Sequence, residues 1–207
     1  MCRLSRHALN GVLIVACAIL QCFGPSADAH RLDEYLQATL FTLEQDRIDM
    51  LMRLTPGVDV SAFVLAGIDR DGNSVVSETE RHAYAERVLR DLSIAVDGKT
   101  LRLELSSVEF PATEDFREGL GEIQIRYSAA LPRGGANRRL VFENHHQARI
   151  SAYLVNCLVP RDRGIRIVAQ ERNTQQSFYQ LDFTQGARPP SPTLPRAAGE
   201  GAVRRLN

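Results

Sequence analysis

Apolar and polar residues alternate in short segments along most of the chain, and this two-residue period constrains the fold more than any other feature. Residues 35–43 are rich in strand formers, and Ile48, Met50 and Met52 alternate with polar neighbours in residues 47–54. A strand with one buried face requires such alternation, because successive side chains point to opposite faces. Turn-forming residues 44–46 separate the two segments, so the sequence predicts a β-hairpin.

The same period returns after Leu92. Ile94 and Val96 precede the dipeptide Asp97-Gly98, which favours a tight hairpin turn between alternating segments. Further alternating segments lie at residues 101–105, 123–127, 139–143, 150–159, 165–170 and 178–183. Short strands at this spacing predict a mainly β fold with an antiparallel, sandwich-like arrangement.

One helical region interrupts the strands, at about residues 59–91. Asp59 is the expected N-cap of a first helix, and Ser77 begins a second helix that runs to about Asp91 with Tyr84 and Val88 on one face. The predicted fold is therefore α+β overall, with a helix–loop–helix unit inserted after the second strand. A doubly wound α/β sheet is not expected, because it would need helices between successive strands.

Residues 69–80 have the sequence DRDGNSVVSETE, which places oxygen atoms at the spacing of a cation-binding loop. Side-chain oxygens fall at loop positions 1, 3, 5, 9 and 12, and the backbone carbonyl of position 7 adds another. The apolar Val76 is expected to tie the loop to the core. A hard cation such as Ca²⁺ takes six to eight oxygens. The candidate metal ligands are Asp69, Asp71, Asn73, Val75, Ser77 and Glu80.

This stretch, with its flanking helices, resembles the EF-hand calcium-binding loop. The sequence shows no second copy, and it departs from the family pattern at Ser74, where glycine is usual, and at Arg81, where an apolar residue is usual. The resemblance implies weak Ca²⁺ binding, on the order of 10⁻⁴ M, with a structural or interaction role. The alternative is an acidic turn between two helices that binds nothing.

The two ends of the chain differ in kind from the domain between them. Residues 1–29 combine Arg3 and Arg6, an apolar run over residues 12–20 and the site Ala27-Asp28-Ala29, which is the pattern of a secretory signal peptide. No later apolar run reaches the roughly 18 residues of a membrane helix. We therefore expect a soluble, exported protein, periplasmic or extracellular. Residues 30–187 form one domain, and the Pro/Gly/Arg-rich residues 188–207 are predicted to be disordered.

Charge and motifs restrict the function further. Residues 30–187 contain 19 Arg and Lys against 23 Asp and Glu, so this mildly acidic domain is not expected to bind nucleic acid. The sequence has no G-x-S-x-G, H-E-x-x-H, C-x-x-C or phosphate-binding loop, which favours a non-enzyme. Cys157 is the one cysteine outside the signal peptide, and its apolar surroundings predict a buried structural thiol, with an intermolecular disulfide as the alternative.

A second resemblance concerns the start of the mature chain. The signal peptide, residues 30–36 (HRLDEYL), a β segment and the D-x-D-G-x loop are similar to the extracytoplasmic part of bacterial nickel-transport accessory proteins of the hydrogenase and urease type. This resemblance implies a transition-metal role, with His30 or the pair His145-His146 contacting Ni²⁺, Co²⁺ or Cu²⁺.

A membrane transporter or another periplasmic protein would then be the partner. Against a histidine metal site, His145-His146 is expected to form a solvated turn, and His82 is expected to face solvent. A third hypothesis is an ion-independent structural or adhesion-like sandwich. The sequence gives no oligomeric state.

Overall fold

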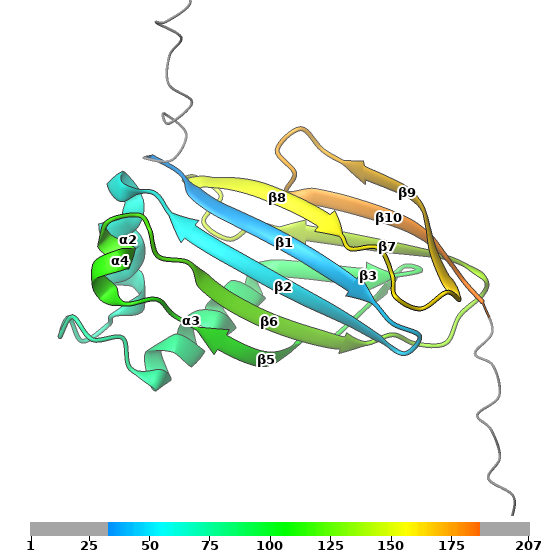
Figure 1. Ribbon diagram of the computed structural model, residues 1–207, viewed down its shortest axis with the longest axis horizontal. Helices are drawn as coiled ribbons and strands as arrows, with labels where there is room; N and C mark the ends of the chain where they lie inside the picture. Colours follow the sequence, from blue (N-terminus) through cyan, green and yellow to red (C-terminus); the bar gives the residue numbers. More distant parts are fainter. Residues whose placement is uncertain (1–32, 187–207) are drawn as a thin grey trace, which may run out of the picture.

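The computed structural model describes residues 33–186 of the chain (Figure 1). The predicted signal peptide over residues 1–29, the residue His30 and the predicted tail over residues 188–207 lie outside the described residues.

Two five-stranded sheets make up most of the described structure, which is a β-dominated α+β fold (Figure 1). In spatial order, the first sheet contains β5 (Glu104–Glu109), β6 (Ile123–Ala130), β2 (Arg47–Pro56), β1 (Tyr35–Leu43) and β8 (Ser151–Cys157). The second contains β4 (Lys99–Thr100), β3 (Leu92–Val96), β7 (Asn137–Asn144), β10 (Phe178–Gln185) and β9 (Ile165–Arg172).

The core lies where the inner faces of the two sheets meet. Alternate residues of β1, β2 and β6 are buried, as the two-residue period predicts. Phe41 of β1 contacts two rings of the second sheet: its centroid lies 5.1 Å from that of Phe142 in an edge-on contact and 5.9 Å from that of Tyr179 in a stacked contact. Such pairs add to the free energy of area burial and fix how the sheets face each other.

Local turns formed where the sequence predicted them. β1 and β2 pair antiparallel from Tyr35↔Pro56 to Leu43↔Ile48, so the first hairpin is confirmed. At the second turn Asp97 and Gly98 both have positive φ, 51° and 76°, which is the backbone of a type I′ hairpin turn. The strand after this turn has only two residues, because the chain then leaves the second sheet and enters the first sheet as β5.

The antiparallel prediction is wrong for one pair. β8 runs parallel to β1, in register from Tyr35↔Ser151 to Phe41↔Cys157. β7 ends at Asn144 in the second sheet, and the short segment 145–150 delivers the chain beside the start of β1. Because β8 therefore starts beside the start of β1, the two strands run in the same direction, on the side of β1 that β2 leaves open.

Three of the four edge strands of the sheets, β5, β9 and β8, have features that disfavour further strand pairing. Ser106 on β5 and Val168 on β9 have no pairing partner, so each of these edge strands carries a bulge. On the β8 edge, Arg172 Nε donates a hydrogen bond of 2.8 Å to the Val155 carbonyl. Bulges and side chains at an edge disfavour the addition of a strand from another chain.

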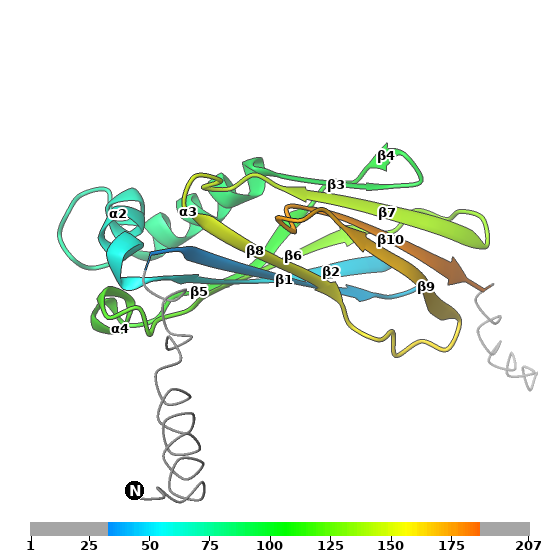
Figure 2. The same ribbon diagram turned by 90° about the horizontal axis from the view of Figure 1, so that it is seen from above.

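The three helices of the described region gather at one end of the sandwich (Figure 2). They are α2 (Val58–Ile68), α3 (Glu78–Arg90) and α4 (Thr113–Arg117). α2 and α3 lie between β2 and β3, where the sequence predicted two helices, and Tyr84 and Val88 of α3 are buried. The short helix α4 was not predicted, because five residues are too few for a helical period.

The predicted N-cap of α2 is wrong. Gly57 holds that position, and Asp59 lies within the first turn without capping it. The Gly57 carbonyl accepts hydrogen bonds from Val60 N (3.2 Å) and Ser61 N (2.9 Å), so the helix begins directly where Pro56-Gly57 ends β2. Glycine at an N-cap is nearly as favourable for helix stability as a residue with a capping side chain.

We expect the inter-sheet contact of Phe41 to dominate the stability of the sandwich. Phe41→Ala should lower the free energy of unfolding by about 3–5 kcal/mol, because it removes a fully buried ring and leaves a cavity. Leu36→Ala is the control, since Leu36 lies on the same strand and is 40% exposed. Urea denaturation measures both variants, and equal losses would contradict this account of the core.

Candidate cation-binding loop

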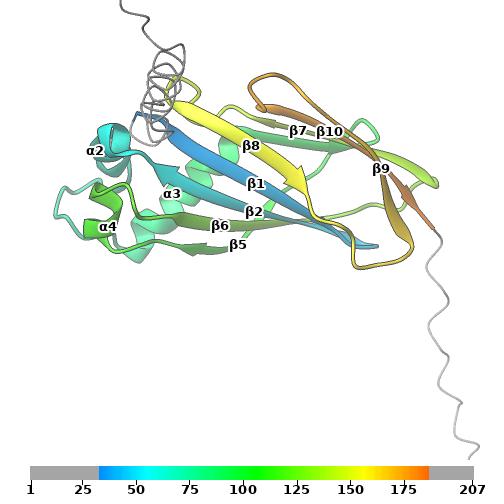
Figure 3. The ribbon, with the colours of Figure 1, turned by 45° about the horizontal axis from the view of Figure 1, so that its top comes forward.

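The candidate loop joins α2 to α3 at the helical end of the molecule (Figure 3). Asp69 is the C-cap of α2, with its backbone N–H donating to the Leu65 carbonyl at 2.8 Å. Ser77 is the N-cap of α3. The two helices therefore hold the first and last parts of the candidate ligand set on one continuous helix–loop–helix.

Hydrogen bonds to side-chain oxygens close the first half of the loop. Asp69 Oδ1 accepts from Asn73 N at 3.1 Å and Asp69 Oδ2 accepts from Ser74 N at 2.8 Å. Asn73 Oδ1 accepts from Val75 N at 2.7 Å. These contacts wrap the backbone around the Asp69 carboxylate and leave the acidic side chains of the loop close to one another.

Glu80 closes the second half. Its Oε2 accepts from Ser77 N at 2.9 Å and from Ser77 Oγ at 2.7 Å, and its own N–H donates to Ser77 Oγ at 3.3 Å, which is a capping box. Its Oε1 accepts from Arg70 N at 2.7 Å, at the start of the loop. The hydrogen bonds from Ser77, more than any other group, lower the pKa of Glu80 to about 2, so it is a carboxylate at neutral pH.

Three carboxylates converge in this loop. Ligand oxygens of Asp69, Asp71 and Glu80 all lie within 4.8 Å of one another. Ca²⁺–oxygen bonds of about 2.3–2.6 Å place two ligands no more than about 5 Å apart across the ion, so these oxygens fit one common ion. The cluster could hold a metal, and carboxylates alone do not select Ca²⁺ over another hard cation.

The side chains of the candidate ligands Asn73 and Ser77 already make hydrogen bonds within the loop. Asn73 Nδ2 donates to Asp71 Oδ2 at 2.8 Å, and Ser77 Oγ donates to Glu80. An ion would therefore replace some of these internal hydrogen bonds when it recruits Asn73 or Ser77. The exposed Val75 offers its carbonyl, while Val76 packs against the core as predicted.

The two positions that depart from the EF-hand pattern have structural neighbours of their own. Ser74 has φ 67°, the left-handed conformation that usually favours glycine, and it lies near Thr113 and Arg117 of α4, with Arg117 Nη2 3.4 Å from Ser74 Oγ. Arg81 donates from Nε to the Val76 carbonyl at 3.1 Å. Arg81 thus fixes the loop residue that reaches the core.

The structure does not bring His145 and His146 to one ion. His145 is exposed and its Nε2 lies 3.0 Å from Glu143 Oε2. His146 is only 1% exposed, and both of its ring nitrogens already have protein partners. The predicted solvated turn is therefore wrong for His146, because β7 has ended and the turn folds this ring inward against α3. His82 is exposed, as predicted.

Cys157 is a buried free thiol, in agreement with the structural interpretation. Burial raises the pKa of this thiol to about 12, which leaves it protonated and unreactive at neutral pH.

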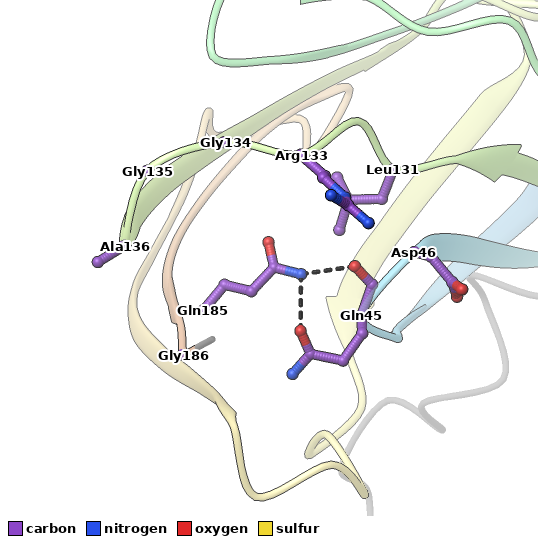
Figure 4. Close-up of a pocket in the computed structure, with 9 residues that line it drawn as sticks. All are labelled: Gln45, Asp46, Leu131, Arg133, Gly134, Gly135, Ala136, Gln185 and Gly186. Atoms are coloured by element: carbon purple, nitrogen blue, oxygen red, sulfur yellow. Dashed lines mark hydrogen bonds between the residues drawn. The ribbon is translucent and has the colours of Figure 1, made fainter. Parts of the chain in front are cut away.

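A pocket of about 670 Å³ lies where the β1–β2 turn meets residues 131–136 and the end of β10 (Figure 4). Within it, Gln185 Nε2 donates to the Gln45 carbonyl at 2.7 Å and to Gln45 Oε1 at 3.1 Å, and Gln185 Oε1 accepts from Arg138 Nη1 at 2.7 Å. No motif in the sequence predicted this pocket.

Comparisons with protein-family models, with curated proteins and with solved structures find no match for this chain. Within residues 33–186, no helix has both the length and the apolar character needed to cross a membrane.

The backbone at Ser74 and Gly72 gives a test of loop strain. Both have positive φ, 67° and 69°, and a Cβ on Gly72 would meet no atom within 4 Å, so Gly72→Ala changes only the backbone preference, whereas Ser74→Gly also removes the long 3.4 Å contact between the Ser74 hydroxyl and Arg117. Ser74→Gly should stabilise the protein by about 0.5 kcal/mol, since relief of the left-handed strain exceeds the added entropy of the unfolded chain. Gly72→Ala should cost about 1 kcal/mol. Urea denaturation in EDTA measures both, and a destabilising Ser74→Gly would contradict the strain at this position.

Proposed function

We propose that this protein binds one Ca²⁺ ion in the loop over residues 69–80. The observation that carries the proposal is the convergence of Asp69, Asp71 and Glu80, whose oxygens share a space the size of one coordination sphere. The full ligand set would add the side chains of Asn73 and Ser77 and the carbonyl of Val75. Three carboxylates at this spacing repel one another without a cation, and a divalent ion removes that repulsion.

The backbone of the loop supports an EF-hand-like mode of binding. Asp69 accepts N–H groups from positions 5 and 6 of the loop, and position 6 has the positive φ that the EF-hand turn requires. Glu80, at position 12, already points back to the start of the loop through Arg70 N. This loop therefore needs local side-chain adjustments, rather than a refolded backbone, to surround an ion.

We propose a structural role for the ion. It would link α2 to α3, and α3 packs on the core through Tyr84, Ala85 and Val88. Affinity on the order of 10⁻⁴ M suits an exported protein that meets high external Ca²⁺. At a free Ca²⁺ concentration 100-fold above Kd, binding would stabilise the folded state by about 2.7 kcal/mol.

Calorimetric titration of the purified chain with Ca²⁺ tests the proposal. The wild type should bind one ion and gain thermal stability in Ca²⁺ relative to EDTA. Glu80→Gln should lose most of both effects, because it removes the charge of the expected bidentate ligand. Glu78→Gln is the matched control: it removes one carboxylate from the same helical turn, outside the candidate ligand set.

The contradicting outcomes are equally specific. A thermal midpoint that is the same in Ca²⁺ and EDTA, with no heat of binding, would favour the ion-independent sandwich. Equal losses in Glu80→Gln and Glu78→Gln would indicate general charge attraction instead of a coordinated site. A parallel titration with Mg²⁺ measures selectivity, and we expect weaker Mg²⁺ binding because Mg²⁺ retains its waters and demands a smaller, octahedral site.

A further inference from the structure

A chain of hydrogen bonds, buried except at Asp91, connects the C-terminal end of α3 to β1. Asp91, the C-cap of α3, contacts His146 Nδ1 through Oδ2 at 2.6 Å. His146 Nε2 lies 3.2 Å from the Tyr84 hydroxyl, which hydrogen-bonds to the Tyr35 hydroxyl. His146 and Tyr84 are 1% exposed and Tyr35 is fully buried, so water does not compete along this part of the chain.

The backbone groups of His146 make hydrogen bonds that fix the position of this residue. The carbonyl of His146 accepts hydrogen bonds from Gln37 Nε2 and from the Tyr153 hydroxyl, both at 2.8 Å. Its N–H donates to Asn144 Oδ1 at 2.9 Å. Contacts to β1, β7 and β8 therefore fix the backbone of His146, while Asp91 and Tyr84 hold its ring.

With His146 neutral, one direction of donation satisfies every group. The Nδ1–H donates to Asp91, the Tyr84 hydroxyl donates to Nε2, and the Tyr35 hydroxyl donates to Tyr84. With His146 protonated, Nε2–H must donate to Tyr84, so the hydroxyl hydrogens of Tyr84 and Tyr35 have only their mutual contact left to share. Within residues 33–186 no further acceptor hydrogen-bonds to either hydroxyl, so one of the two hydrogens would be left unsatisfied in the core, which is costly.

The charged groups around His146 have opposite effects on the protonation of its ring. Asp91 favours a protonated ring and Arg87 disfavours it, while Tyr35, Tyr84 and Tyr153 are neutral phenols whose pKa values are raised by burial. Desolvation by burial is the largest influence and lowers the pKa of His146 below its ordinary value. The stability due to the neutral ring is therefore present above the unfolded-state pKa of roughly 6.5 and is lost as pH falls below it.

Helix α3 joins this chain to the candidate cation loop. Glu80 lies in the first turn of α3, Tyr84 follows one turn later, and Asp91 caps the far end. A helix of this length moves largely as one body, so the contacts of Tyr84 and Asp91 help to set where the Glu80 carboxylate stands relative to Asp69.

We infer that a neutral His146 and an occupied cation loop support each other through α3, so that acidification weakens Ca²⁺ binding. The inference rests on the proposed function, and it names the regulation of that site. Both conditions favour the same docked position of α3, and coupling through a shared two-state element is reciprocal. A coupling in the usual range would weaken Ca²⁺ binding about fivefold when His146 is protonated.

Nuclear magnetic resonance of the wild-type histidines gives a direct test that requires no variant. The titration midpoint of His146 should move to lower pH in Ca²⁺ than in EDTA. His145 is the control, because it is adjacent in sequence but exposed and outside the hydrogen-bond chain. His82 lies close to the loop, so the change in its titration midpoint measures the direct electrostatic effect of the ion on a nearby histidine. An unchanged His146 midpoint, or a shift no larger than that of His145, would overturn the inference.

Calorimetry at two pH values, one above and one below the titration midpoint of His146 found by nuclear magnetic resonance, gives the second test. At the lower pH, protonation of His146 should weaken Ca²⁺ binding about fivefold in the wild type and in His145→Gln. In His146→Gln this contribution to the pH dependence should be absent. All three proteins have the same loop carboxylates. Direct competition between protons and Ca²⁺ for these carboxylates is therefore the same in each protein and cancels in the comparison.

The outcomes separate the two proposals. Absence of Ca²⁺ binding by the wild type at both pH values would overturn the proposed function and the inference together. Ca²⁺ binding with the same pH dependence in wild type and His146→Gln would overturn the inference and leave the proposed function standing.

Discussion

The hydroxyl of Tyr84 is the point at which the three parts of this fold meet. It lies on α3, hydrogen-bonds to Tyr35 of the first sheet and contacts His146, in the turn that leaves the second sheet. A buried polar group needs its partners in place, because an unpaired one costs more than a typical hydrogen bond contributes. An apolar contact in place of these hydrogen bonds would allow α3 to shift over the core with a small loss of stability. This hydrogen-bond chain instead specifies one position for the helix, and that position determines where the loop begins to close.

The position of α3 decides what the loop can do. Because the far part of the helix is fixed by Tyr84 and Asp91, Glu80 is held at a constant distance from the core and needs only its carboxylate to change partners. In the structure, Glu80 bonds to Ser77 and to Arg70 N, and these contacts close the loop. A cation bound as proposed would replace part of this internal bonding, which would lower its net gain. The proposed weak affinity would then have two causes: the hydrogen bonds that Glu80 and Ser77 already make and the left-handed backbone at Ser74.

Features set by neighbours in sequence were predictable, and features set by distant partners were not. The hairpin at residues 44–46 and the turn at Asp97-Gly98 follow from local turn chemistry and alternation, and both formed as expected. The parallel pairing of β8 depends on segment 145–150, which carries the chain from the second sheet to the start of β1. The burial of His146 depends on Asp91 and Tyr84, which lie 55 and 62 residues away along the chain. The spacing of the candidate ligands was readable from sequence, whereas the use of their oxygens inside the loop required the structure.

A sensor and a structural site differ in what the ion moves. In a sensor the helices of the ion-binding unit change their angle and expose an apolar groove, so the unit must have two arrangements of similar free energy. Here a large rotation of α3 would separate Tyr84 from Tyr35 and leave buried hydroxyls and the His146 ring without partners. That cost opposes an open arrangement. The ion would therefore tighten an existing helix pair, and protons at His146 would modulate that tightening without opening the domain.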